Sequence, residues 1–446
     1  MRRLLLAITP LLALPLLGLP AWIALHRSDL PAVDDADMRL QPRDVAPEDD
    51  AFHWFGAAGD AVSWSDDTDV FALLRALRNG EETEVGSVAE LARENTEAFR
   101  LLERGLSAPD IRIPAFSLDP GAYDTVGVLL PLQALVRIAA DEALLAARRG
   151  PTSESIERAL LGMRIGRKLG SAREIQMLEL MVAATAQRTS LGAMVDLAAR
   201  GHLGREDLAF LARRLGELRW DEKAWERAWA AEYRFVERSL SEVFDAPQPG
   251  DAGNQEQSLP GRMAGWLPDD YRFHRNRTLS LLADEYRILQ ANSHRDCALS
   301  EPAATEMTLL DAKPTLGLAL RNLLTPNYAG RVAVRAGVPN LWRFDTRRCH
   351  LETQIALVQG LLATAAYHSE QGRLPDRLDD LVPTYLDAVP RDRFDGQPLR
   401  WSPESGVLYS IGADLIDRGP PPEPALSNEA VPSVHVPSGR MPARAS

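Results

Sequence analysis

Between residues 68 and 245 the chain consists of one apolar-periodic segment after another, and this pattern predicts a mainly α-helical protein. In one such segment the leucines fall on a single helical stripe, at Leu208, Leu211, Leu215 and Leu218. The connections between segments are short and often contain glycine. Successive helices with short connections favour antiparallel pairs, so we expect stacked helical hairpins.

Helix boundaries can also be predicted from local motifs. Ser171 and Glu174 stand three residues apart at the start of the segment 171–201. This is the spacing of a capping box, in which two side chains satisfy the free N–H groups of a helix start. We therefore expect a helix to begin at Ser171 and to end at Gly201, because glycine commonly follows a helix C-terminus.

The first 25 residues predict a membrane segment. Arg2 and Arg3 precede an uncharged run from Leu4 to Leu25, which as a helix would span about 30 Å of hydrocarbon. The two arginines place the N-terminus in the cytoplasm and the body on the other side of the membrane. A retained signal anchor and a cleaved signal peptide both fit. The length of the run and the lack of a clean Ala-x-Ala site favour the anchor.

Composition narrows the class of protein further. The formal net charge is -13 and the sequence contains no basic block. A nucleic-acid-binding protein needs a basic surface to neutralise phosphates, so nucleic acid is excluded as a partner of this chain. Arginine greatly outnumbers lysine, which together with frequent Ala and Leu suggests a bacterial source. We expect a single-pass protein of the bacterial inner membrane with its body in the periplasm.

The domain organisation follows from shifts in composition. Residues 1–25 are the predicted transmembrane signal anchor, and residues 26–50 are acidic and contain proline, as in a linker. Residues 51–345 form the predicted helical-hairpin domain, with a polar, flexible loop at about 246–262. A tail at 420–446 is disordered by composition.

Residues 346–419 have a different pattern and predict a small α+β module. A helix at 346–371 ends at Gly372, and Asp395-Gly396 is a tight-turn dipeptide. Two strands follow in "QPLRW" and "VLYSIG". One helix against a short antiparallel sheet is the expected arrangement.

This module resembles the globular domains of type II secretion pseudopilins, which are type IV pilin-like. The shared pattern is a helix ending in Tyr and "GRLP", then Leu-x-x-Leu-Val-Pro, "PRD", "PLRW" and "LYSIGAD". Similar tails occur in membrane-anchored helical proteins of bacteria, which the whole chain resembles. The prepilin-peptidase signature is absent from the N-terminus, and about 300 residues separate the apolar run from the module. The resemblance therefore implies a pilin-like fold without assembly into a pseudopilus.

The same resemblance raises the question of a metal. Pseudopilins of this type often bind calcium in the loop after the last strand, and the matching positions are Asp414 and Asp417. Calcium takes six to eight oxygen ligands, and the following "RGPPPEPALS" supplies few. The expectation is that the chain has no cofactor, with calcium at these aspartates as the alternative.

Cys297 and Cys349 are the only cysteines. In an oxidising compartment two cysteines in one domain most simply form a disulfide. Free buried thiols are an alternative. A zinc site with the neighbouring His294 and His350 is another, although the spacing matches no common pair of metal knuckles.

Motifs for catalysis are absent from the sequence, including H-E-x-x-H, G-x-S-x-G, the P-loop and the Rossmann fingerprint. The sequence therefore predicts a non-enzymatic, membrane-anchored, periplasm-facing scaffold or interaction protein with a protein partner in the cell envelope. A cell-envelope hydrolase with a site in a groove between helices is the first alternative. A pseudopilin-like component associated with a secretion system is the second.

Overall fold

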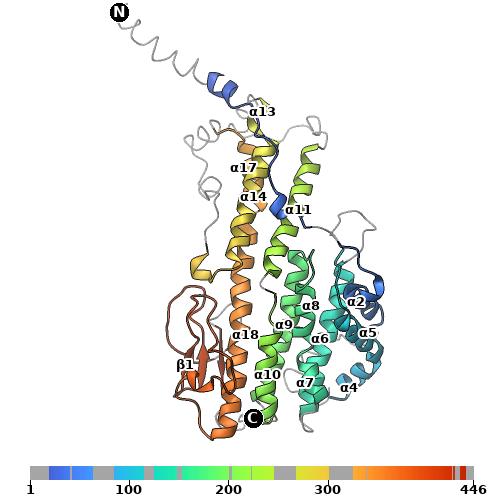
Figure 1. Cartoon of the computed structure of the whole chain (residues 1–446), viewed down its shortest axis with the longest axis vertical. Coiled ribbons are helices and arrows are strands. Elements are labelled where there is room, and N and C mark those ends of the chain that lie inside the picture. The colour runs from blue at the N-terminus through green and yellow to red at the C-terminus, as the bar shows by residue number, and fades with distance from the viewer. Residues whose placement is uncertain are drawn as a thin grey trace, which may run out of the picture. The chain divides into compact units, whose positions relative to one another are not determined.

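The computed structural model describes residues 20–40, 43–63, 85–114, 125–147, 153–199, 203–221, 223–245, 268–300, 325–337, 339–423, 425–426 and 432–437. These residues are mainly helical, with one small antiparallel sheet near the C-terminus (Figure 1), so the predicted fold class is confirmed. Most of the predicted signal anchor, and the loop predicted at 246–262, lie outside them. Within the described ranges no helix has both the length and the apolar character needed to cross a membrane.

The chain forms two compact units, each assembled from separate stretches. Unit 1 comprises Met1–Arg39, Tyr233–Leu289 and Glu301–Arg343. Unit 2 comprises Leu40–Glu232, Gln290–Ser300 and Phe344–Ser446. The domains predicted from the sequence are consecutive ranges instead, and apart from the tail discussed below they stay a prediction.

Unit 2 contains most of the helices. They are η2 (Pro47–Asp49), α2 (Ala51–Asp60), α4 (Val85–Glu94), α5 (Thr96–Ser107), α6 (Thr125–Ala147), α7 (Ser153–Ala159), α8 (Leu161–Gly170), α9 (Met177–Ala199), α10 (Arg205–Glu217), η4 (Cys297–Leu299), η5 (Leu378–Leu381), the start of α11 (Ala224–Asp245) and most of α18 (Pro339–Gln371). α2 packs against α5, while α8 and α6 both pack against α9. The backbones of α8 and α9 approach closely at Gly162, where an added Cβ atom would lie 2.1 Å from the carbonyl oxygen of Ala186.

The helix predicted to begin at Ser171 begins six residues later, at Met177, so the predicted capping box is wrong. Ser171 instead ends the preceding helix. Its backbone N–H donates to the carbonyl oxygens of Arg167 and Lys168, and its hydroxyl group donates to Lys168 as well. A serine can satisfy either end of a helix, and here the end of α8 uses it.

The sheet packs on α18. Strands β1 (Arg400–Ser402), β2 (Val407–Tyr409) and β3 (Ser433–His435) are antiparallel in the order β1-β2-β3, with Leu408 opposite Trp401 on one side and Val434 on the other. Figure 1 shows the sheet beside the long α18. The side chains of this core are buried and come from α10, α18, η5 and the sheet, among them Leu211, Leu215, Leu361, Leu362, Leu378, Leu381, Leu408 and Val434.

The third strand corrects one prediction. The composition of residues 420–446 predicts a disordered tail. Within them, Val434 and Val436 are buried whereas His435 is exposed. This alternation is the strand pattern, and it pairs with β2 to bury two valines. The predicted tail is therefore wrong for Ser433–His435.

Unit 1 contains η1 (Ala36–Met38), the larger part of α11, α13 (Asp269–Arg272), α14 (Arg275–Asn292, with its last three residues in unit 2), α17 (Tyr328–Gly337), the start of α18 and a helical stretch at residues 20–25. Asn327 joins three of these helices. It is fully buried in the left-handed region at φ 59°. Its backbone N–H donates to the Tyr271 carbonyl, and its side-chain oxygen accepts from the N–H of His274 (2.8 Å) and the hydroxyl of Thr278 (3.0 Å). Asparagine tolerates this backbone region better than other non-glycine residues.

Candidate functional site

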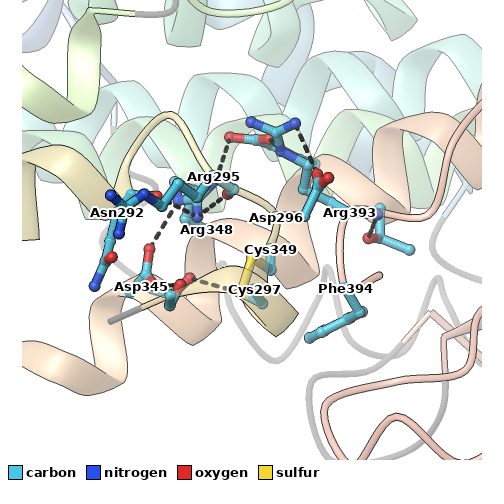
Figure 2. Close-up of a disulfide and its surroundings, with 12 residues drawn as sticks. Asn292, Arg295, Asp296, Cys297, Asp345, Arg348, Cys349, Arg393 and Phe394 are labelled. Carbon is cyan, nitrogen blue, oxygen red and sulfur yellow. Dashed lines mark hydrogen bonds and ion pairs between the residues drawn. A yellow bond between two sulfur atoms is a disulfide. The ribbon is translucent and has the colours of Figure 1, made fainter. Parts of the chain in front are cut away.

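The two cysteines form a disulfide in unit 2. Cys297 lies at the start of η4 and Cys349 lies in α18, with their Cα atoms 6.4 Å apart. Cys349 is fully buried, and Phe394 and Ile411 of the C-terminal module pack around it. The disulfide therefore fastens the stretch that follows α14 to the long helix beside the sheet (Figure 2).

Arg348, the residue before Cys349, is completely buried. Its guanidinium group donates to the Asp345 carboxylate (2.9 Å) and to the carbonyl oxygens of Asn292 (3.1 Å) and Arg295 (2.9 Å). Figure 2 shows these contacts beside the sulfur–sulfur bond. Asn292 is the last residue of α14, and its carbonyl group also accepts from the backbone N–H of Arg295 (2.9 Å). Arg348 therefore adds a second donor at a helix C-terminus and places a positive charge where it is favourable.

The loop 391–396 closes the other side of the cluster. Cys297 and Ala298 donate their backbone N–H groups to the carbonyl oxygens of Arg393 (3.1 Å) and Phe394 (2.8 Å). Asp296 forms an ion pair with Arg393 at 3.0 Å. Gly396 has φ +71°, and a Cβ atom there would lie 2.2 Å from the Asp296 carboxylate. Because only glycine fits, this position lets the loop approach Asp296.

Asp392 organises the loop from inside. Its fully buried carboxylate accepts from the backbone N–H groups of Phe394 (3.0 Å) and Ile411 (2.9 Å), and Arg400 lies 3.2 Å away. A buried carboxylate with several donors and a cation is a stable structural centre. This "PRD" aspartate therefore holds the module together. Its oxygens are engaged by these donors.

The histidines of the zinc alternative do not converge on the cysteines. His294 lies 3.2 Å from the Glu226 carboxylate. His350 packs edge-on against Phe394 with the ring centres 4.8 Å apart. The two sulfur atoms are bonded to each other, so neither is a thiolate ligand. Within the ranges that the structure describes, no three His, Cys, Asp or Glu side chains are placed to hold a metal ion.

Asp414 and Asp417, the positions matching a calcium loop, are both paired with arginines. Asp414 accepts from Arg418 (2.5 Å) and from the N–H of Ile416 (3.2 Å), and the Arg418 guanidinium group lowers its pKa. Asp417 accepts from the N–H of Gly419 (2.9 Å) and lies 3.9 Å from Arg400. The two carboxylates therefore stabilise their own turn through neighbouring donors.

A cationic group next to this cluster was not predicted from the sequence. Two nitrogen atoms of Arg188 in α9 are buried and have no hydrogen-bond partner among the described residues. Its charge adds to burial in lowering the pKa of His350, and the charge of Arg347 adds to burial in lowering that of Arg188. The four residues of "RRCH" thus have different surroundings. Arg348 caps a helix, Cys349 forms the disulfide, and Arg347 and His350 lie near Arg188.

Two glutamates near the start of α9, the buried Glu179 and the partly buried Glu232 of α11, were also missed. Glu179 is completely buried and accepts from the N–H of Gln176 (3.0 Å), while Glu232 of α11 accepts from the N–H of Met177. Burial raises the pKa of both carboxyl groups, and the Glu179 charge raises that of Glu232 further. Thr125 lies beside Glu179, but no hydrogen bond of normal geometry from a described residue reaches Oε1. The only sequence signal was one acid inside the apolar stretch "MLELMV".

A surface pocket of about 330 Å³ lies where α5 meets α7 and α8. Its charged lining residues are Arg100, Glu103, Glu154, Glu157 and Arg158. The glutamates have arginine partners, since Arg164 lies 2.6 Å from Glu103 and Arg158 lies 3.7 Å from Glu154. Acid–base catalysis needs carboxylates held in contrasting environments, and these are alike. The pocket therefore gives no specific support to the hydrolase alternative.

The strongest cluster of chemically capable side chains is thus the one around the disulfide, and its groups are used to join chain segments. No protein-family model, curated protein or solved structure matches the chain.

Proposed function

We propose that the chain is a non-enzymatic scaffold or interaction protein, anchored in the bacterial inner membrane and facing the periplasm. The observation that carries the proposal is the Cys297–Cys349 disulfide. Disulfides persist in oxidising compartments, whereas cytosolic thiols are kept reduced. The apolar run after Arg2 and Arg3 supports the same location.

The surroundings of the disulfide support a scaffold over an enzyme. Arg348 and Asp392 are fully buried and bonded to backbone groups. Such contacts fix the positions of neighbouring segments, which is what a scaffold needs to present a surface. We include the pilin-like character of residues 346–419 in the proposal as the expected fold of the C-terminal module.

Compartment and anchoring are tested first. Cells producing the full chain are treated with a thiol-reactive polymer before and after reduction, and membranes are then washed with carbonate. We expect the protein to stay in the membrane pellet and to shift on a gel only after reduction. The matched control, Cys297→Ser with Cys349→Ser, should not shift. Thiols that react without reductant would contradict the proposed compartment.

The scaffold role is tested by purifying the tagged full chain from crosslinked membranes. Deleting residues 346–446 would be a poor control, because Leu361 and Leu378 share one core with Leu211 of α10. We expect a partner of constant stoichiometry and no turnover of cell-wall or peptide substrates by the purified protein. Measurable turnover would replace the scaffold with the hydrolase alternative.

A further inference from the structure

Residues 27–39 belong to the predicted acidic linker, yet they are fastened along the helices of unit 1. Arg27 forms a two-pronged ion pair with Asp270 at the start of α13, with nitrogen–oxygen distances between 2.6 and 2.9 Å. Two residues later, the Asp29 carboxylate accepts from the N–H groups of Asn276 (2.7 Å) and Arg277 (3.0 Å). Asp29 thereby satisfies free donors at the start of α14.

The attachment continues along the stretch. Asp35 is almost fully buried and lies 3.2 Å from the Tyr233 hydroxyl group. Asp37 forms a two-pronged pair with Arg287 at 2.9 and 3.0 Å. A free linker would allow the body to move away from the membrane. These contacts instead hold the stretch that follows the helical residues 20–25 against the helices of unit 1.

The same end of unit 1 exposes apolar side chains. Trp22, Leu25 and Leu30 are 43%, 76% and 42% exposed. Trp22 and Leu25 are the last part of the apolar run that ends at Leu25, and Leu30 follows it by five residues. Tryptophan is enriched where a protein crosses from hydrocarbon to water, so Trp22 is suited to a membrane interface.

Arginines are frequent in the stretches of unit 1 that are linked to residues 27–30. We call them the basic collar, and they are Arg27, Arg272, Arg275, Arg277 and Arg331. The residues 26–30, 268–277 and 328–337 that supply them contain only three acids, Asp29, Asp269 and Asp270. Contacts within unit 1 bring these stretches together, because Arg27 pairs with Asp270, and Asn327 joins α13, α14 and α17. A local basic excess in a chain of net charge -13 favours an anionic surface.

We propose that the basic collar, with Trp22, Leu25 and Leu30, rests on the anionic phospholipid headgroups of the membrane. This inference rests on the proposed membrane anchoring and adds how unit 1 meets the bilayer. A lipid surface fits better than a protein partner because the apolar residues continue directly from the apolar run. Arginines next to a membrane segment are attracted to anionic headgroups within about one Debye length of the surface.

The test uses the full chain with its disulfide intact, reconstituted in nanodiscs of neutral phosphatidylcholine with or without phosphatidylglycerol. A fluorophore is attached at Ser28→Cys, inside the collar. The matched control label is at Asp284→Cys, also exposed and about 13 Å further along α14 than Arg275. Lipids with a nitroxide on the headgroup quench a label that lies at the surface. We expect stronger quenching at position 28 than at 284, and an increase at position 28 with phosphatidylglycerol.

The arginines are then tested by charge. Arg275→Gln with Arg277→Gln should lose the phosphatidylglycerol-dependent increase, whereas Arg275→Lys with Arg277→Lys should keep it. Equal, weak quenching at both labels in chains that have entered nanodiscs overturns the docking and leaves the anchor standing. Quenching at position 28 that ignores lipid charge and both variants overturns the role of the collar. A chain that does not enter nanodiscs overturns the anchoring itself, and the docking with it.

Discussion

Two short connecting stretches are fastened to helices by contrasting means. Residues 27–39 are held on unit 1 largely by exposed ion pairs, such as Arg27–Asp270, in which both side chains are about half exposed. Residues 295–300 are held in unit 2 by a disulfide, by backbone hydrogen bonds and by the buried Arg348. The contacts of residues 27–39 are therefore largely exposed to solvent, whereas those of residues 295–300 are largely buried.

The contrast predicts different sensitivities. Exposed ion pairs contribute up to about 1 kcal/mol each and are weakened by salt and acid. A disulfide and buried hydrogen bonds are not weakened by moderate salt or moderate acid, but the disulfide is broken by reductants. Unit 2 should therefore be the redox-sensitive part, and the start of unit 1 the salt-sensitive part.

The largest expected effect is the loss of the disulfide. Cys297 and Cys349 are separated by 52 residues, and closing a loop of that size stabilises the folded state by about 4 kcal/mol. Cys297→Ser with Cys349→Ser should lower the free energy of unfolding of unit 2 by about that amount, as measured by urea unfolding. Reduction of the parent should produce the same loss, and reductant should not affect the double variant. A double variant as stable as the parent would refute the contrast.

Arg348→Met should cost slightly less, about 3 kcal/mol, because it removes the cationic partner of the buried Asp345 carboxylate and one donor each from the carbonyl groups of Asn292 and Arg295. Methionine fills a similar volume, so the loss reports the polar contacts. Thermal unfolding of the oxidised protein measures it. Arg347→Met on the exposed neighbour is the control and should change the midpoint little. A similar loss in both variants would mean that the burial of Arg348 is not the cause.

These two contacts differ in how far the sequence predicts them. A pair of cysteines in a chain with a membrane segment favours a disulfide by count and compartment alone. Nothing in "TRRCH" distinguishes Arg348 from Arg347, because which arginine enters the interior depends on the rotation of α18 against residues that are distant in sequence. Helices and their apolar stripes were predicted because their signals are local, whereas the disulfide was predicted from the number of cysteines and the compartment.

Composition was misleading where pairing is long-range. Residues 27–39 are acidic with no periodicity, which is typical of a linker, but their partners Tyr233 and Arg287 are about 200 or more residues away. β3 was missed because the pattern around Val434 is only a few residues long and lies among prolines. Glu179 was missed because nothing local in the sequence shows that a lone acid in an apolar helix is buried.

The same contrast between burial and exposure is found at two helix starts. The buried Glu179 accepts a backbone N–H at the start of α9, and the exposed Asp29 accepts backbone N–H groups at the start of α14. The pKa of Glu179 is raised by burial, so its contribution to stability is full below the unfolded pKa of about 4.3 and is lost as pH rises through the folded pKa. Glu179→Gln keeps an acceptor for the N–H of Gln176 and removes the charge. We expect it to stabilise the protein by about 1 kcal/mol at pH 8 and to have no such effect near pH 4.

Thermal unfolding between pH 4 and 8 follows this difference. Glu206→Gln, at a side chain that is 92% exposed, is the control and should leave the pH profile unchanged. A Glu179→Gln variant that is less stable at pH 8 would show that the carboxylate is favourable in its charged form. A charged carboxylate would then stabilise the start of α9 as it does the start of α14, and burial would make no difference between the two sites.

The smallest expected effect is at Asp37, and it addresses the exposed fastening directly. Asp37 and Arg287 are 53% and 36% exposed, so Asp37→Asn should destabilise the attachment by only about 0.5 kcal/mol at low salt. Arg287 lowers the pKa of Asp37, and a lowered pKa means that the contribution is present above about pH 4 and is lost as pH falls through the folded value. Hydrogen exchange of residues 30–39 should therefore be faster in the variant at pH 7.

The same exchange experiment, repeated at high salt, tests whether exposed ion pairs hold residues 27–39. The difference between parent and Asp37→Asn should vanish in 1 M salt, where the Debye length is about 3 Å, while exchange of residues 295–300 should not change. Asp44→Asn is the matched control, because this aspartate is fully exposed and its ion pair with Arg112 is long, at 3.8 Å. If residues 30–39 stay as protected in salt as in its absence, then the buried Asp35 holds this stretch instead, and both fastenings depend on burial.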